Sequence, residues 1–179
     1  MDELDRPKAP RGQPRPVTDE QLAKLLGASE PLRTAFMLAA YSGLRRAEIA
    51  RSRREHITEE RILIPIAKGG DAQAVPTHPL LWAHVRDFPA GPLVPNSRGE
   101  HFTLNALSQR VDYWMLTHGM KGVTLHKLRH WFGSVVQREY GDIRVTQELL
   151  RHVSIATTQV YTAVATDAKR AAIGHLPRV

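Results

Sequence analysis

Residues 126–161 read HKLRHWFGSVVQREYGDIRVTQELLRHVSIATTQVY, and this stretch decides how the chain is interpreted. It contains His126 and Arg129, then His152, and finally Tyr161. Guanidinium and imidazole groups hold a phosphate and manage its protons. A tyrosine beside them is a nucleophile that can attack the phosphate. The combination indicates cutting and rejoining of a nucleic-acid backbone, and the other motifs of the sequence test this interpretation.

The composition favours a folded domain with a polyanionic partner. The chain has 179 residues, of which 42% are hydrophobic, enough for one globular domain with a core. It carries 25 Lys and Arg against 18 Asp and Glu, a net charge of +7. Residues 91–179 hold 11 basic and 6 acidic side chains, so the half with the suggestive motif is the more positive. This balance favours nucleic acid, with a merely soluble basic protein as the alternative.

Several classes of protein are disfavoured by what the sequence lacks. It contains no cysteine, which excludes disulfides and thiolate metal sites. No apolar run approaches the roughly 18 residues that a membrane span needs, and no signal segment begins the chain. We therefore expect a cytoplasmic protein, in a bacterium or a phage-infected host cell, with no membrane partner.

The first sixteen residues are predicted to form a basic, proline-rich arm or linker. Proline removes backbone donors and favours extended chain, so no helix is expected there. Such an arm either lies along DNA, leads to a further domain or is a frayed terminus. Its prolines and basic residues are Pro7, Pro10, Pro14, Pro16, Arg6, Lys8, Arg11 and Arg15.

Helix signals dominate from Thr18 onward. Thr18 and Gln21 have the spacing of a capping box, which predicts a helix start. A second helix is expected after Ser29, with Pro31 in its first turn, and Gly43 should end it. Residues 45–51 are typical of a short third helix.

One hairpin interrupts the helices. Residues 61–66 and 74–76 predict two strands around a turn at 68–71 that contains Lys68. Pro65 indicates that at least one strand is an edge. From Leu80 the pattern is helical apart from a loop at 89–101. We therefore expect a mainly α fold with a small antiparallel β-sheet, of the α+β class.

The stretch from Gly43 to Glu48 is a candidate phosphate site. Arg45 follows a helix-ending glycine and stands at the start of the next helix, where free backbone N–H groups attract anions. Glu48 lies one turn further on, so it can orient Arg45 from behind. The alternative is an ordinary surface ion pair.

His126 and Arg129 should share one face of a helix beginning near Thr124. His126 and His130 have the i, i+4 spacing of two metal ligands, but a zinc protease requires glutamate where Lys127 stands. We therefore disfavour a metal, and expect His130 to pack or hydrogen-bond inside the domain.

The segment Val145–Val164 also fits a helix-turn-helix without catalysis. In that interpretation a first helix ends near Leu150 and a second begins at Ile155. Polar side chains of the segment would contact bases or phosphates, and Tyr161 would be buried. The interpretation does not explain why His126, Arg129 and His152 should converge.

Several motifs in order resemble the catalytic domain of the tyrosine recombinases, the phage integrase family. The resemblance covers roughly residues 17–170 and is more specific than any one motif. The motifs are Gly43-Leu44-Arg45-x-x-Glu48, Lys68 in a hairpin turn, His126-x-x-Arg129-His130, Leu149-Leu150-x-His152 and Tyr161.

The resemblance implies site-specific DNA recombination by two transesterifications. Tyr161 would attack a phosphodiester, forming a 3′-phosphotyrosine and releasing a 5′-hydroxyl, and Arg45 and Arg129 would clamp the phosphate oxygens. Lys68 would protonate the leaving oxygen, and His126 and His152 would assist. Support is expected from Glu48 and His130, and DNA contacts from Arg46, Lys127 and Arg151. No metal, ATP or other cofactor is implied.

Two alternatives to recombination remain. Nicking and closing of DNA, as by a type IB topoisomerase, uses the same chemistry, and a non-catalytic helix-turn-helix regulator uses none of it.

The resemblance also implies a domain organisation and partners. Residues 17–179 would form the catalytic domain, with a tail helix from about 166, and we expect the family's separate N-terminal core-binding domain to be absent. The partner would be a double-stranded attachment or recombination site, bound by a tetramer that exchanges residues 166–179 in trans, with accessory DNA-bending or directionality proteins. Two departures stand out: Arg151 replaces a common glycine, and the turn after Lys68 is less basic than usual.

Overall fold

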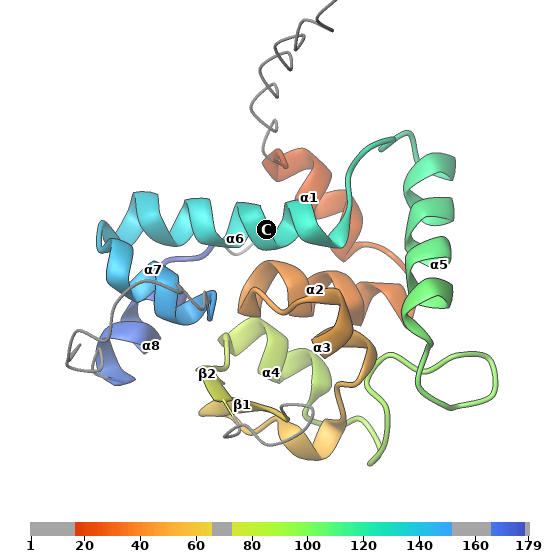
Figure 1. The fold of residues 1–179 in the computed structure, drawn as a ribbon, viewed down its shortest axis with the longest axis horizontal. Helices are drawn as coiled ribbons and strands as arrows, with labels where there is room; N and C mark the ends of the chain where they lie inside the picture. The colour runs from red at the N-terminus through yellow and green to blue at the C-terminus, as the bar shows by residue number, and fades with distance from the viewer. Residues whose placement is uncertain (1–16, 66–72, 152–165, 178–179) are drawn as a thin grey trace, which may run out of the picture.

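The computed structural model describes residues 17–65, 73–151 and 166–177. Within these ranges the fold is mainly helical with one two-stranded antiparallel sheet, which confirms the predicted fold class. Figure 1 shows the arrangement of the elements. They are α1 (Asp19–Leu26), α2 (Leu32–Ser42), α3 (Arg46–Ala50), the 3-10 helix η1 (Arg54–His56), β1 (Arg61–Ile64), β2 (Gln73–Pro76), α4 (Pro79–Val85), α5 (Leu104–Thr117), α6 (Leu125–Tyr140), α7 (Ile143–Leu149) and α8 (Thr166–Gly174).

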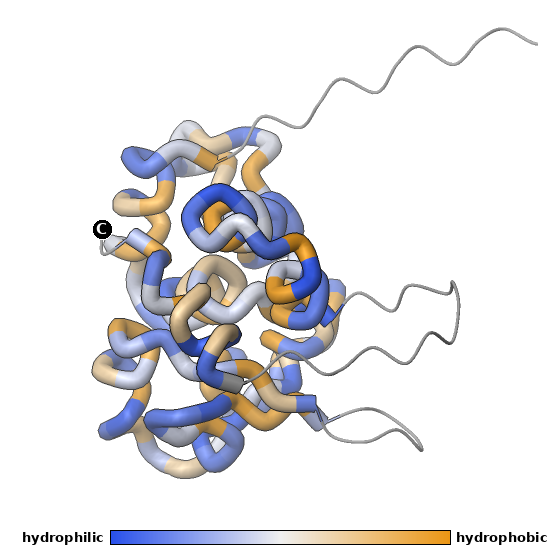
Figure 2. Tube along the Cα trace, turned by 90° about the vertical axis from the view of Figure 1, so that its left-hand side faces the viewer, coloured by the Kyte–Doolittle hydropathy of each residue, from blue (hydrophilic) through white to orange (hydrophobic). Residues whose placement is uncertain are grey.

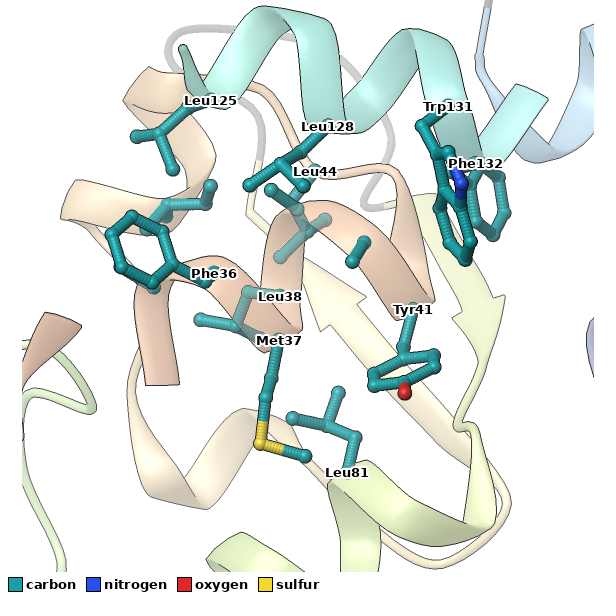
Figure 3. Packing of buried hydrophobic residues seen from close by; sticks show 14 of the residues in the cluster. Phe36, Met37, Leu38, Tyr41, Leu44, Leu81, Leu125, Leu128, Trp131 and Phe132 are labelled. Atoms are coloured by element: carbon teal, nitrogen blue, oxygen red, sulfur yellow. The ribbon is translucent and has the colours of Figure 1, made fainter. Parts of the chain in front are cut away.

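Helix α2 forms the centre of the core. Every one of its residues except Arg33 is buried, which is why it is apolar on nearly all sides. Helix α6 packs along it, and α1, α3 and α4 also contact it. Figure 3 shows side chains of α2, among them Phe36 and Leu38, below Leu125 and Leu128 of α6. The hydrophobic effect therefore fixes α6, the helix of the His126-x-x-Arg129 motif, against the middle of the domain.

Two glycines let α6 approach its neighbours closely. Gly43 ends α2 in the left-handed conformation with φ of 57°, as predicted. An ideal Cβ at Gly43 would lie 2.7 Å from Cδ1 of Phe132, and one at Gly133 would lie 2.8 Å from Cδ1 of Leu150. Any larger residue at either position would push α6 away from the end of α2 or from the end of α7.

The predicted helix caps are present. The Gln21 N–H donates to Thr18 Oγ1 over 3.2 Å, and the Thr18 N–H donates to Gln21 Oε1 over 3.1 Å, which completes the capping box of α1. Thr124 caps α6 in the same manner, since its Oγ1 accepts the N–H of Lys127 over 3.2 Å. Pro31 differs slightly from expectation, because it precedes the first helical residue of α2.

The sheet is the predicted hairpin, with Arg61 opposite Pro76 and Ile64 opposite Gln73. Both strands are edges because the sheet has only two, which accommodates the proline that follows β1. The turn with Lys68 lies outside the described residues.

Helix α8 packs on its own domain, against α6, α7 and β2. Ala172, Ile173 and Leu176 are buried there. The hydroxyl of Tyr41 donates to the carbonyl of Pro177 over 3.3 Å. The segment after the motif region therefore closes one side of the core in the single chain.

The outer helices follow an amphipathic pattern. Figure 2 shows hydrophobic positions interspersed with hydrophilic ones along the trace. Helices of this kind bury one face and expose the other. Within the described residues, no helix is long and apolar enough to cross a bilayer.

Candidate active site

Arg129 is the most deeply placed of the predicted site residues. It lies in the second turn of α6, and only 5% of its surface is exposed. Its Nη1 donates to the carbonyl of Gly43 and its Nη2 donates to the carbonyl of Leu150. Gly43 is at the C-terminal end of α2 and Leu150 is at the C-terminal end of α7, so the Arg129 guanidinium connects both helices to its own helix, α6. A planar fork with five donors suits this role better than an ammonium group.

Arg45 stands opposite, at the N-terminal end of α3. Its Nη1 lies 3.0 Å from Glu48 Oε1, and its backbone N–H donates to Glu48 Oε2 over 2.7 Å. The spacing predicted this pair. The Arg45 side chain is 43% exposed whereas that of Glu48 is 16% exposed, so the carboxylate supports the arginine from the protein side.

Arg151 occupies an inward position that the sequence did not predict. Its backbone is left-handed, with φ of 51°, and its guanidinium is buried against Glu48 and the carbonyls of Leu149 and Gly43. We expected this side chain to contact DNA, but its hydrogen bonds are directed into the protein. The left-handed conformation explains why glycine suits this position.

Burial and the close approach of these cations lower the pKa values of two of the arginines. Burial, followed by the charges of Arg45 and Arg151, lowers the pKa of Arg129 to about 10, although Glu48 opposes this shift. Burial also lowers the pKa of Arg151, again opposed by Glu48. Three guanidiniums thus lie near one carboxylate, Glu48, which pairs with Arg45 and Arg151 only, and this leaves an excess of positive charge for an anion to neutralise.

A pocket of about 560 Å³ opens at the N-terminus of α6. Four basic residues line it against a single acidic one, Asp112, and the positive end of a 16-residue helix adds to the field. Nη1 of Arg46 lies 2.5 Å from Ser108 Oγ, which ties α3 to α5 at the rim. A pocket with this charge and these donors favours a phosphate. Its basic residues are Arg45, Arg46, His126 and Arg129.

His126 lines this pocket and contacts His130 on the next turn of α6. Their Nε2 atoms lie 2.9 Å apart, and their rings meet edge to face. Partial burial and the charges of His130 and Arg129 lower the pKa of His126, which favours a neutral ring. The expectation that His130 lies inside is wrong, because it is exposed on the next turn of α6. No group of three potential metal ligands occurs among the described residues.

Three predicted site residues, Lys68, His152 and Tyr161, lie outside the described residues. The other predicted residues come together: Arg45, Arg46, His126 and Arg129 line one pocket, with Glu48, His130 and Lys127 adjacent in their helices. Two pocket residues, Ser108 and Asp112, were missed. Their i, i+4 spacing, each one position after the buried Leu107 and Val111, is the signal of a polar face on α5.

The fold is that of the tyrosine recombinases, a class of enzyme that cleaves and rejoins DNA. The chain belongs to the phage integrase family, whose model matches residues 15–168.

Individual relatives extend this assignment. The chain is 33% identical over 191 residues to the tyrosine recombinase XerA of Thermococcus kodakarensis, covering 96% of this chain and 67% of the relative. The solved integrase of mycobacterium phage Brujita is similar with a TM-score of 0.78 and 32% identity, covering 97% of this chain and 62% of that one. The chain therefore spans about two thirds of the length of these relatives.

Lambda integrase shares the fold at lower identity. Its tetramer bound to a Holliday junction matches with a TM-score of 0.59 and 17% identity, over 82% of this chain and 49% of that one. A lambda integrase dimer bound to a core site matches with a TM-score of 0.60 and 19% identity, over 78% of this chain and 45% of that one. These relatives bind DNA as dimers or tetramers.

Proposed function

We propose that this chain cleaves and rejoins duplex DNA at a specific site through a 3′-phosphotyrosine on Tyr161. The observation that carries the proposal is the pair of guanidiniums, Arg45 and Arg129, at a positively charged pocket on the N-terminus of α6. Phosphoryl transfer requires mostly positioning and charge stabilisation, and this pocket supplies both.

The proposed steps are as follows. One of the two histidines, His126 or His152, takes the phenolic proton of Tyr161 as its oxygen attacks phosphorus. The bond from phosphorus to the 5′-oxygen breaks, and the leaving oxygen takes a proton from Lys68. A 5′-hydroxyl of a partner strand then reverses the exchange. One ester replaces another at each step, so the reaction needs no ATP.

Each arginine has a distinct position in this proposal. Arg129 is held by two backbone carbonyls, so it approaches the phosphate from a fixed place. Arg45 is more exposed and is held by Glu48. Preorganised donors of this kind contribute on the order of a hundredfold to a thousandfold each to the rate of the chemical step. The neutral form of His126 favoured by its lowered pKa can accept a proton or donate one hydrogen bond to the phosphate.

DNA binding is proposed to rest on cations around the pocket. Arg46 lines it, and Lys127 follows His126 on the first turn of α6. We expect affinity to fall steeply with salt, because each phosphate contact releases a counterion.

We also propose that active assemblies form on DNA, with residues 166–179 exchanged between protomers. Such exchange must expose Ala172, Ile173 and Leu176, which are buried on their own domain in the single chain. Sedimentation with and without the DNA site tests this. A DNA-bound monomer that keeps its α8 contacts would contradict it.

The deciding experiment uses a nicked suicide duplex that carries the site of the native recombination system. Cleavage traps the chain covalently, and sequencing of the attached DNA identifies the site and the polarity. Tyr161→Phe should abolish trapping and leave DNA affinity within about twofold, because only the nucleophile is removed. Binding without trapping by the parent chain, matched by a full-length control that traps, would instead favour a helix-turn-helix regulator.

A plasmid without the site separates the remaining alternative. A recombinase leaves its superhelical density unchanged. Relaxation of that plasmid would favour nicking and closing like a type IB topoisomerase.

A further inference from the structure

Arg151 follows α7 in a conformation that is uncommon for a residue with a side chain. Its φ is 51°, and it is the single residue other than glycine with a positive φ in the described part of the chain. Its side chain is only 4% exposed. A residue held in an unfavourable backbone region and buried at the same time must be fixed by its contacts.

Those contacts are all within the protein. Arg151 Nη1 donates to the carbonyl of Leu149 over 3.0 Å, and Nη2 donates to the carbonyl of Gly43 over 3.3 Å. The same Nη2 lies 2.6 Å from Glu48 Oε2. The guanidinium therefore joins the end of α7 to the end of α2 and to α3.

The backbone of Arg151 adds a second link. Its carbonyl accepts a hydrogen bond from Nη2 of Arg45 over 2.7 Å. Nη1 of Arg45 lies 3.0 Å from Glu48 Oε1. Glu48 thus bridges the two guanidiniums, with one oxygen on each. The Arg45 guanidinium is held at Nη1 by Glu48 and at Nη2 by the main chain of Arg151.

We propose that Arg151 is a positioning residue that fixes the phosphate-binding guanidinium of Arg45, through Glu48 and through its own carbonyl. It does so in place of contacting DNA. The inference rests on the proposed function of Arg45. Without the Arg151 side chain, Glu48 loses one of its two cations, and the backbone at position 151 loses the bonds that hold it left-handed.

Two independent readouts test this, and the first needs no activity. Nitrogen-15 side-chain NMR of the DNA-free chain reports how tightly the Arg45 guanidinium is held. We expect slow rotation of this group in the parent and fast rotation in Arg151→Met. An Arg45 signal unchanged in Arg151→Met would overturn the proposal whether or not the chain cleaves DNA.

The second readout separates positioning from DNA contact. For Arg151→Met, we expect the single-turnover rate of covalent trapping to fall about tenfold to a hundredfold, the scale of a misplaced donor. Its DNA affinity and the salt dependence of that affinity should stay within about twofold of the parent, whereas a lost phosphate contact lowers the salt slope by about 1. Lys127→Met is the comparison variant that should lower the slope. A lowered slope in Arg151→Met with an unchanged trapping rate would refute the inference.

Further variants address folding and the route through Glu48. Arg151→Gly suits the left-handed backbone, so it should fold even where Arg151→Met does not, and it should show the same mobile Arg45. Arg151→Lys keeps a charge for Glu48 and should recover part of the rate. In a Glu48→Gln background, Arg151→Met should slow trapping by much less than in the parent. Equal, independent reductions would show that Arg151 acts by another route. The two proposals can fail separately. If the parent does not trap DNA but the Arg45 guanidinium still becomes mobile in Arg151→Met, the enzymatic function is rejected and the positioning role is retained.

Discussion

Gly43→Ala should destabilise the chain far more than the same change at another helix-ending glycine. Gly43 has φ of 57°, where an L-residue costs roughly 1–2 kcal/mol. In addition, its new Cβ would lie 2.7 Å from Cδ1 and 2.9 Å from Cε1 of Phe132, a fully buried ring. Overpacking of this kind adds about 1–3 kcal/mol. We therefore expect the unfolding free energy to fall by about 2–5 kcal/mol.

Gly141→Ala is the matched control. Gly141 ends α6 with φ of 81°, and its Cβ would meet no heavy atom within 4 Å. It should therefore lose only the backbone part, about 1–2 kcal/mol. Urea unfolding followed by circular dichroism measures both variants, and the difference between them isolates the clash with Phe132. Equal losses in the two variants would show that α6 does not approach the end of α2 as closely as described.

Three further outcomes are expected. Arg129→Lys should lower the unfolding free energy by about 1–3 kcal/mol, because an ammonium group leaves one buried carbonyl unpaired. It should also slow covalent trapping at least about a hundredfold. A variant with the stability and trapping rate of the parent would contradict this. Ile173→Ala should cost about 2–5 kcal/mol in urea unfolding if α8 is part of the cooperative core, whereas a loss below about 0.5 kcal/mol would indicate an independently detaching tail. The pKa of His126 is lowered on folding, so the unfolded chain binds that proton more readily and stability falls as pH drops below about 6.5; His126→Gln should flatten this acid loss, and an unchanged pH profile would argue against it.

Sequence patterns predicted the local features of the fold well. Thr18 and Thr124 cap helices through their own hydroxyls, and Gly43 ends α2 through its own backbone freedom. Such signals depend on a few neighbouring residues, so they can be recognised in the sequence without knowledge of the fold. The Arg45–Glu48 pair was predicted for the same reason.

Features that depend on distant partners were not predicted. Arg151 was expected to contact DNA, yet its side chain is buried, and arginine is rarely buried. Its inward position depends on Glu48 and on the carbonyl of Gly43, both more than 100 positions away along the chain. Ser108 and Asp112 enter the pocket only because α5 lies beside α3, and sequence spacing does not reveal that neighbour.

The carbonyl of Gly43 accepts hydrogen bonds from both Arg129 and Arg151, so folding places two positively charged guanidiniums next to each other. The charge of Arg151 therefore disfavours the charged form of Arg129, and a tetrahedral oxyanion in the pocket lined by Arg129 would offset that effect. Millimolar sulfate or phosphate should accordingly raise the melting temperature by mass action, since such an ion binds only the folded chain. The same ions would occupy the place of the DNA backbone, so buffers chosen for storage would act as competitors in a cleavage assay.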